Sequence, residues 1–193
     1  MLFALVSKKL NMRLFLFIGI VFGASLTLHA QEVEWMALEE ALAAQKKKPK
    51  KIIMDVYTTW CGPCKMMDKF TFANPDVARY INENFYPVKF NGEGNDTIKY
   101  KGNKYRNPYY DPKKANTRNS PHLFAYSLGV KAYPSLVYFD ESGDVIQAIP
   151  GYLEPNELEL FLKLINTDDY KKITTAEAWE EYQENFEPQF KTE

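Results

Sequence analysis

The sequence is poor in cysteine and histidine. The 193-residue chain contains two cysteines, Cys61 and Cys64, and two histidines. Two cysteines cannot form the multi-bridge framework of a small disulfide-rich domain, and this donor set is a poor one for a zinc site. We therefore expect no metal, and we expect the two cysteines to act as a pair.

An excess of charge of one sign is also lacking. The 24 basic and 25 acidic side chains give a formal net charge of -1. A protein that binds the phosphate backbone of nucleic acids usually carries a basic excess, so no nucleic-acid partner is expected. A hydrophobic content of 46% is enough for one well-packed domain.

Long apolar runs are absent after the first 30 residues. Three basic side chains, Lys8, Lys9 and Arg13, precede an apolar run at 14–28, and residues 1–30 contain no acidic side chain. A basic start, an apolar middle and a small residue at the end, here Ala30, are typical of a secretory signal peptide. We predict a signal peptide at 1–30 and a periplasmic or otherwise exported protein. A buried helix and an uncleaved membrane anchor are the alternatives.

After residue 31 the chain alternates between helical and extended patterns. Continuous apolar runs of strand length predict buried strands, and apolar residues at a spacing of three and four predict helices. Asn74 followed by Pro75 and Asp76 is a strong helix start. The sequence thus predicts an α/β fold. We expect strands at 52–57, 85–91, 135–139 and up to 149, and helices at 36–46, after Cys61, after Asn74, at 120–128 and around 158–165.

Residues 92–119 depart from this alternation. Gly, Asn, Lys, Pro and Asp dominate the segment, with four tyrosines between them. A segment this long without a regular pattern indicates an insertion with a binding role or a mobile loop. The tyrosines are either a docking surface or a small core of the insertion itself. His122, just after the insertion, lies in a polar segment and is expected at the surface.

A further helix is predicted near the end of the chain. Thr174 and Glu177 form a capping box ahead of three aromatic residues. This helix can dock on the same chain or on a second copy. The predicted organisation is a signal peptide at 1–30, a domain at 31–170 that includes the insertion, and a helical extension at 171–193.

The two cysteines directly follow the first predicted strand, in Trp60-Cys61-Gly62-Pro63-Cys64. A spacing of three on the first helical turn brings two sulfurs close enough to bond. Free N–H groups at a helix N-terminus favour a thiolate, so Cys61 is the expected exposed nucleophile. Cys64 can then attack a mixed disulfide at Cys61 and release the substrate. Gly62 keeps the turn tight, and Pro63 suits a first turn.

Two other interpretations of the pair are weaker. A structural disulfide here would close a loop too small to constrain the unfolded chain much. Half of a zinc site would need two more ligands, and after residue 30 the chain offers only His122 beside carboxylates.

The segment from Ile53 to Lys65 resembles the active-site signature of the thioredoxin family. Tyr133-Pro134-Ser135 lies where that family has its cis-proline, and the resemblance extends over roughly residues 34–166. It implies a thioredoxin fold, with a central mixed sheet flanked by helices. The insertion and the extra C-terminal helix are departures from the family pattern. With its leader, the chain is most similar to exported bacterial thioredoxin-like proteins.

The resemblance implies roles for residues outside the cysteine pair. Asp55 is a lone acid in an apolar strand, so we expect it to be buried and protonated near neutral pH. In the family this acid is the base that helps to deprotonate the residue matching Cys64, and Lys89 resembles the lysine that approaches it. An exposed aspartate at a strand edge is the alternative.

The resemblance also implies a substrate-binding surface. Tyr133, before the cis-proline Pro134, is expected to offer its backbone to an extended substrate. Trp60 is expected to shield the disulfide and contact partners, unless it is a simple core residue. Gly62 and Pro63 complete the predicted substrate-binding set.

The predicted function is thiol-disulfide exchange with protein substrates, with the Cys61–Cys64 disulfide in place of any bound cofactor. The Gly-Pro dipeptide between the cysteines resembles the reducing members of the family. A reductase in an oxidising compartment must itself be reduced again, which predicts a membrane electron donor. The alternatives are an oxidase or isomerase of exported proteins and a peptide-binding module whose cysteines are incidental.

Overall fold

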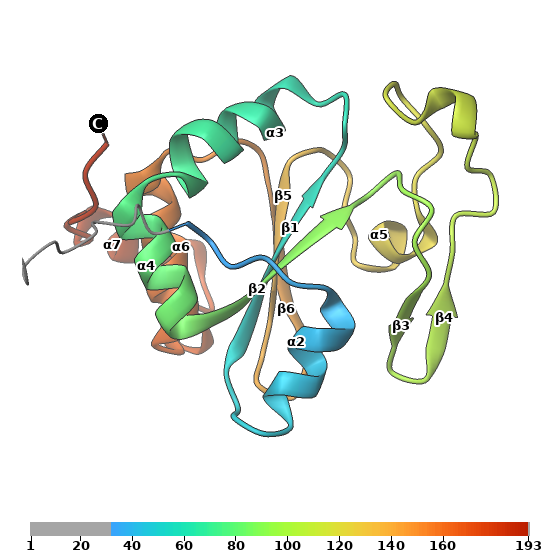
Figure 1. Ribbon diagram of the computed structural model, residues 1–193. Helices are drawn as coiled ribbons and strands as arrows, with labels where there is room; N and C mark the ends of the chain where they lie inside the picture. Colours follow the sequence, from blue (N-terminus) through green and yellow to red (C-terminus); the bar gives the residue numbers. More distant parts are fainter. Residues whose placement is uncertain (1–31, 193) are drawn as a thin grey trace, which may run out of the picture. The chain divides into compact units, whose positions relative to one another are not determined.

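The computed structural model describes residues 32–192 (Figure 1), so the predicted signal peptide lies outside the described residues. Its central sheet has the strand order β2-β1-β5-β6. β1 (Lys51–Tyr57) runs parallel to β2 (Phe85–Asn91) and antiparallel to β5 (Ser135–Phe139), and β6 (Val145–Pro150) is antiparallel to β5. The predicted mixed sheet is confirmed.

β1 is buried because helices cover both faces of the sheet. Alternate side chains of a strand point to opposite faces. Ile53 belongs to one apolar cluster, while Ile52, Met54 and Val56 belong to the other. Asp55, two residues from Ile53, therefore faces the first cluster.

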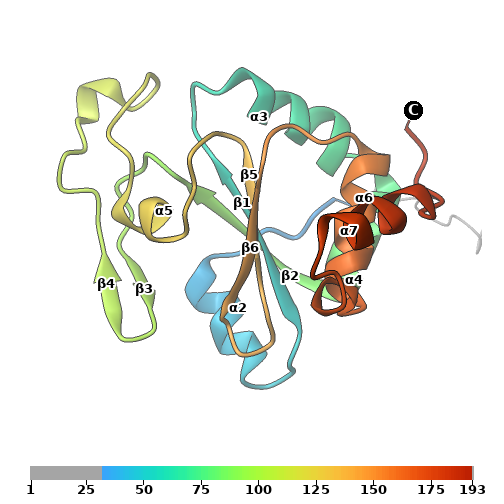
Figure 2. The same ribbon diagram turned by 180° about the vertical axis from the view of Figure 1, so that it is seen from behind.

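Two helical layers provide these clusters (Figures 1 and 2). The first cluster includes residues of α4 (Pro75–Asn84), α6 (Pro155–Asn166) and the π-helical turn Met67–Phe72. The second includes residues of α2 (Leu38–Gln45) and α5 (Leu123–Ser127). The sheet thus has helices on both of its faces, as the α/β prediction requires.

Side-chain caps set where these helices begin. The Asn74 side chain accepts hydrogen bonds from the backbone N–H groups of Asp76 and Val77, at 2.9 and 3.3 Å, as the sequence predicts. α5 begins at Leu123 rather than at residue 120, because the ring of His122 accepts a bond from the Phe124 N–H.

The segment 92–119 is folded. It contains the hairpin of β3 (Ile98–Tyr100) and β4 (Asn103–Tyr105), followed by a 3₁₀ turn at Pro112–Lys114. The rings of Tyr100 and Tyr105 lie 5.5 and 5.2 Å from the ring of Phe124 on α5. These two tyrosines thus extend the second cluster. Tyr109 is 78% exposed.

The C-terminal helix α7 (Ala176–Glu184) docks on the same chain. The ring of Trp179 stacks on Phe161 of α6, with centroids 5.8 Å apart. The helix is capped by Thr175, whose hydroxyl accepts a bond from the Ala178 N–H, and not by Thr174 as predicted. Between residues 32 and 192 no helix is long and apolar enough to span a membrane.

Candidate functional site

Cys61 and Cys64 form a disulfide at the start of α3 (Gly62–Met66), with their Cα atoms 5.3 Å apart. Cys61 is the N-cap residue, and its sulfur accepts a hydrogen bond from the Cys64 N–H at 3.1 Å. The two cysteines are 2% and 3% exposed. The expectation of an exposed Cys61 is therefore wrong for the disulfide state, because the bridge and this bond turn its sulfur onto the helical turn. Gly62 and Pro63 are exposed instead.

The Tyr133–Pro134 peptide bond is cis and lies at the same end of the sheet as the disulfide. Ser135, the next residue, pairs with Val56 near the end of β1. Pro134 is buried, and its carbonyl accepts a bond from Gly151 at 2.8 Å. β5 therefore brings this proline and the cysteine pair to one edge of the sheet.

The Tyr133 side chain packs closely against Gly92. Its hydroxyl donates to the Gly92 carbonyl at 3.0 Å, and burial raises the pKa of Tyr133 to about 12. A Cβ atom at position 92 would lie 2.4 Å from the tyrosine ring. Glycine is therefore required here by close approach.

Asp55 is 2% exposed and forms an ion pair with Lys89 on β2, at 3.0 Å between Oδ2 and Nζ. The two residues are partners in the register of β1 and β2. Within the described residues, Oδ1 of Asp55 has no hydrogen-bond partner. Burial raises the pKa of Asp55 from 3.8 to about 6, against the opposing effect of Lys89.

This pKa corrects the predicted protonation of Asp55. With a pKa of about 6, roughly one carboxyl in ten is protonated at pH 7, so the ionised form predominates. The prediction underestimated how strongly the ammonium group of Lys89 favours the ionised form of Asp55. Burial disfavours the charged form of Lys89. The carboxylates of Asp55 and Asp68 outweigh this effect and raise the pKa of Lys89. Its ammonium group also lies over three rings, at 4.9, 5.2 and 5.4 Å from their centroids: Trp35, Tyr57 and Phe72.

Trp60 is held by residues of the segment 92–119. Its indole N–H donates to the carboxylate of Glu93 at 2.7 Å, and the Asn119 N–H donates to the same oxygen at 2.7 Å. The guanidinium of Arg118 lies 4.8 Å from the centre of a Trp60 ring. Sequence reasoning missed Glu93 and Arg118, because these contacts join residues far apart in the chain.

His122 lies in the interior, so the expected surface position is wrong. It is 0% exposed. One ring nitrogen accepts a bond from the Phe124 N–H at 3.0 Å, and the other is 2.8 Å from the Asp96 carbonyl oxygen. Burial lowers the pKa of His122, which favours the neutral ring. This histidine therefore has a structural role within the described chain.

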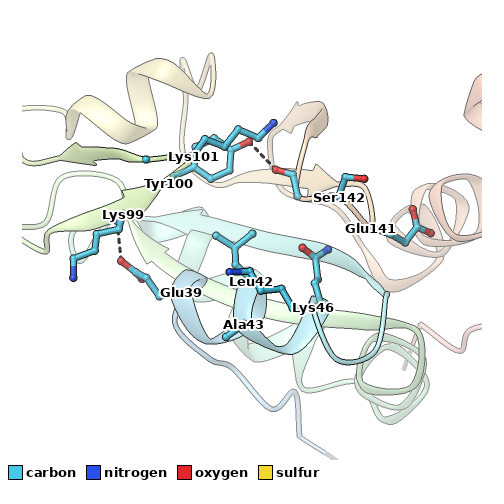
Figure 3. Close-up of a pocket in the computed structure, with 12 residues that line it drawn as sticks. Glu39, Leu42, Ala43, Lys46, Lys99, Tyr100, Lys101, Glu141 and Ser142 are labelled. Carbon is cyan, nitrogen blue, oxygen red and sulfur yellow. Dashed lines mark hydrogen bonds between the residues drawn. The ribbon is translucent and has the colours of Figure 1, made fainter.

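A hollow of about 540 Å³ lies at the opposite end of the sheet, between α2, β3 and the turn after β5 (Figure 3). The Lys99 N–H donates to Glu39 at 2.8 Å, and the Tyr100 hydroxyl donates to the Gly143 carbonyl at 2.8 Å. That turn follows Phe139, which pairs with Ile52 at the start of β1. The hollow is thus separate from the disulfide. The residues from 32 to 192 also contain no cluster suited to a metal ion.

The thioredoxin-like domain family matches residues 38–166. The thiol:disulfide interchange protein DsbD of Citrobacter koseri is 30% identical over 107 residues, which cover 55% of this chain and 14% of that protein. DsbD of Klebsiella pneumoniae is 45% identical over 44 residues, 23% of this chain and 7% of that protein. The chain thus spans a small part of these curated relatives.

Solved structures agree on the fold. A thioredoxin-fold protein from Helicobacter pylori superposes with a TM-score of 0.50 at 16% identity, over 76% of this chain and 94% of that one. A thioredoxin from Thermus thermophilus gives 0.50 at 16% identity, over 69% and 87%. Fold and disulfide together support thiol-disulfide oxidoreductase activity in general, and the chain belongs to the thioredoxin-like domain family.

Proposed function

We propose that the protein exchanges two electrons between its Cys61–Cys64 dithiol and disulfides of other proteins outside the cytoplasm, and that it works as a reductase. The observation that carries the proposal is the disulfide at the start of α3, beside a cis-proline. The basic and apolar leader at 1–30 supports export and its removal as a signal peptide. Residues 31–170 are then the catalytic domain, with 171–193 as its extension.

The reaction begins with the reduced protein. The Cys61 thiolate attacks one sulfur of a substrate disulfide, which forms a mixed disulfide and releases the first substrate thiolate. The Cys64 thiolate then attacks the Cys61 sulfur, closes the internal disulfide and releases the second substrate thiolate. The two released thiolates take up the two protons that the cysteines gave up. The substrate gains two electrons, and the dithiol loses them.

Asp55 is proposed as the base that takes the proton from Cys64. It faces the layer that includes the π-helical turn continuing α3. Its pKa of about 6 leaves it ionised at pH 7 yet basic enough to accept a proton. Lys89 keeps this buried carboxylate charged between turnovers.

The proposed substrate surface surrounds the disulfide. Gly62 and Pro63 are exposed at the start of α3, and Trp60 is partly exposed beside them. An extended substrate segment is proposed to pair with the backbone at Tyr133, next to Pro134, as an added strand. The proposed partners are protein thiols and disulfides, with a membrane electron donor that reduces the Cys61–Cys64 disulfide again and no bound cofactor or metal.

The direction of electron flow is tested by a redox equilibrium. The purified protein is equilibrated in graded dithiol buffers, and its free thiols are counted by alkylation. A midpoint of about -270 mV supports a reductase, whereas one of about -120 mV would favour an oxidase or isomerase. A Cys61→Ser/Cys64→Ser variant separates catalysis from binding. If that variant still reduced disulfides, the dithiol mechanism would be wrong.

A further inference from the structure

Residues 98–119 form a basic arm on a chain that is otherwise acidic. The arm contains seven basic side chains and one acidic side chain, Asp111. The rest of the chain from residue 31 onward contains 14 basic and 24 acidic side chains. All seven basic residues of the arm are exposed. They are Lys99, Lys101, Lys104, Arg106, Lys113, Lys114 and Arg118.

Part of the arm is fastened beside the disulfide. The Thr59 hydroxyl, two residues before Cys61, donates to the Ala115 carbonyl at 2.7 Å. The buried carboxylate of Glu93, 6% exposed, accepts bonds from both Trp60 and Asn119. Both views show the later part of the arm, in darker yellow than the β3–β4 hairpin, next to the connection between β1 and α3 (Figures 1 and 2). The part of the arm around Ala115 and Asn119 is therefore attached on the side where a substrate must approach.

The loop 111–119 within the arm is closed at its base. The Asn119 side chain accepts a bond from the Asp111 N–H at 3.0 Å and donates to the Asp111 carbonyl at 2.8 Å. The Asp111 carboxylate accepts a bond from the Lys113 N–H at 3.0 Å, so the one acid of the arm caps the loop backbone. The loop is thus held in place and carries its charge outward.

Three cations of this loop are available to a partner. Within the described residues, no carboxylate pairs with Lys113, Lys114 or Arg118. Arg118 lies against the Trp60 ring. Its guanidinium is therefore positioned beside Trp60, the residue that precedes Cys61.

We propose that the loop 111–119 is a docking surface for acidic polypeptide segments that flank the disulfide of a substrate. The inference rests on the proposed function, since it names the substrates that the Cys61–Cys64 dithiol takes in preference. A polypeptide partner is favoured over a lipid surface or a nucleic acid because the loop adjoins the group that reacts with protein disulfides.

Charge complementarity acts mainly on the rate of encounter. The screening length is about 8 Å at physiological ionic strength, so the loop attracts an acidic segment that passes close to Cys61. Charges at the rim of an interface change the association rate and its salt dependence more than they change affinity. We expect acidic flanks to speed reduction by about tenfold at low salt, and we expect added salt to reduce this advantage.

The test uses two peptide disulfides that are identical except for Glu or Lys in their flanks. The protein is first reduced and freed of reductant, and its rate of oxidation by each peptide is measured in single turnover. Lys113→Glu/Lys114→Glu should abolish or invert the preference for the acidic peptide. Lys47→Glu/Lys48→Glu is the matched control, because it makes the same change of charge near the start of β1, at the opposite end of the strand from Cys61.

Each outcome separates the two proposals. If the unaltered protein reduced neither peptide, the proposed reductase function would fail. If it reduced both peptides equally at every salt concentration, or if both double variants changed the preference alike, the docking surface would be refuted while the function stood. The docking surface for acidic polypeptides would also be refuted if the loop variant lost binding to anionic vesicles or RNA but kept the peptide preference. The rate with a small uncharged disulfide should be the same in all three proteins.

Discussion

Replacing Asp55 by Asn should stabilise the oxidised protein at neutral pH. The pKa of Asp55 is about 6 in the folded chain, against an ordinary value of 3.8. A raised carboxyl pKa means that folding disfavours the ionised form. A shift of about two units corresponds to about 3 kcal/mol of unfolding free energy. Asparagine has nearly the same shape and cannot ionise, so the variant avoids this cost.

The effect has a defined pH window. Below about pH 3 the carboxyl is protonated in both states, and this favourable contribution to the stability of the unaltered protein is fully present. As pH rises through 6, the contribution is lost. The unfolding free energy of the Asp55→Asn variant should therefore gain on that of the unaltered protein by about 3 kcal/mol between pH 3 and pH 7. Urea unfolding of both oxidised proteins across this range measures the gain.

The comparison is made as a change in the difference between two proteins. The substitution also changes the contact between residue 55 and Lys89. A contribution of this kind that is the same at every pH cancels when only the change of the difference with pH is used. Asp96→Asn, which removes an exposed carboxylate, is the matched control. A difference in unfolding free energy that stays constant with pH within about 0.5 kcal/mol, or that grows toward acid pH, would refute the raised pKa of Asp55.

Three further substitutions test the site and its support. Cys64→Ser should trap a mixed disulfide between Cys61 and substrate, seen on a non-reducing gel. No adduct would contradict attack by Cys61. His122→Ala should cost about 2–4 kcal/mol in urea unfolding, because it leaves a cavity and two unpaired backbone groups. A loss below about 0.5 kcal/mol would contradict this. Gly92→Ala should displace the Tyr133 ring and cost about 1–3 kcal/mol, and an unchanged stability would show that the ring moves freely.

The strands were predictable because their pattern is local. The strands at 85–91 and 135–139 begin and end as expected, and the run at 52–57 lies within β1. Each is a short apolar run that helices cover on both faces, and such runs mark buried strands. The start of α4 was equally clear, since Asn74 and Pro75 form the cap themselves.

The hairpin in the insertion was missed although it has a local signal. Lys101 and Gly102 have φ values of 48° and 78°, the left-handed conformation typical of a two-residue hairpin turn. The polar composition around them obscured the short strands. Tyr100 and Tyr105 are partly buried and pack against Phe124, a contact that only the folded chain reveals. The same dependence on tertiary packing explains the misjudged His122.

The candidate site was predictable where motif and position coincide. The cysteine pair and the proline could be found from the residues around them. Glu93 could not, because its partner Trp60 is 33 residues away and nothing in the spacing joins them. The protonation of Asp55 could not be fixed either, since it depends on how closely Lys89 approaches.

The ionic environment of Asp55 explains why the pKa of this buried acid has an intermediate value. An isolated carboxylate at this depth would stay protonated at neutral pH, and a fully satisfied ion pair would hold it far below its ordinary pKa. Here Lys89 is shared with Asp68 and three aromatic rings, and one oxygen of Asp55 has no partner within residues 32–192. Partial compensation leaves the pKa of Asp55 about 6, between these extremes. The carboxylate is therefore charged at rest and can still accept a proton, which is what the proposed exchange at Cys64 requires.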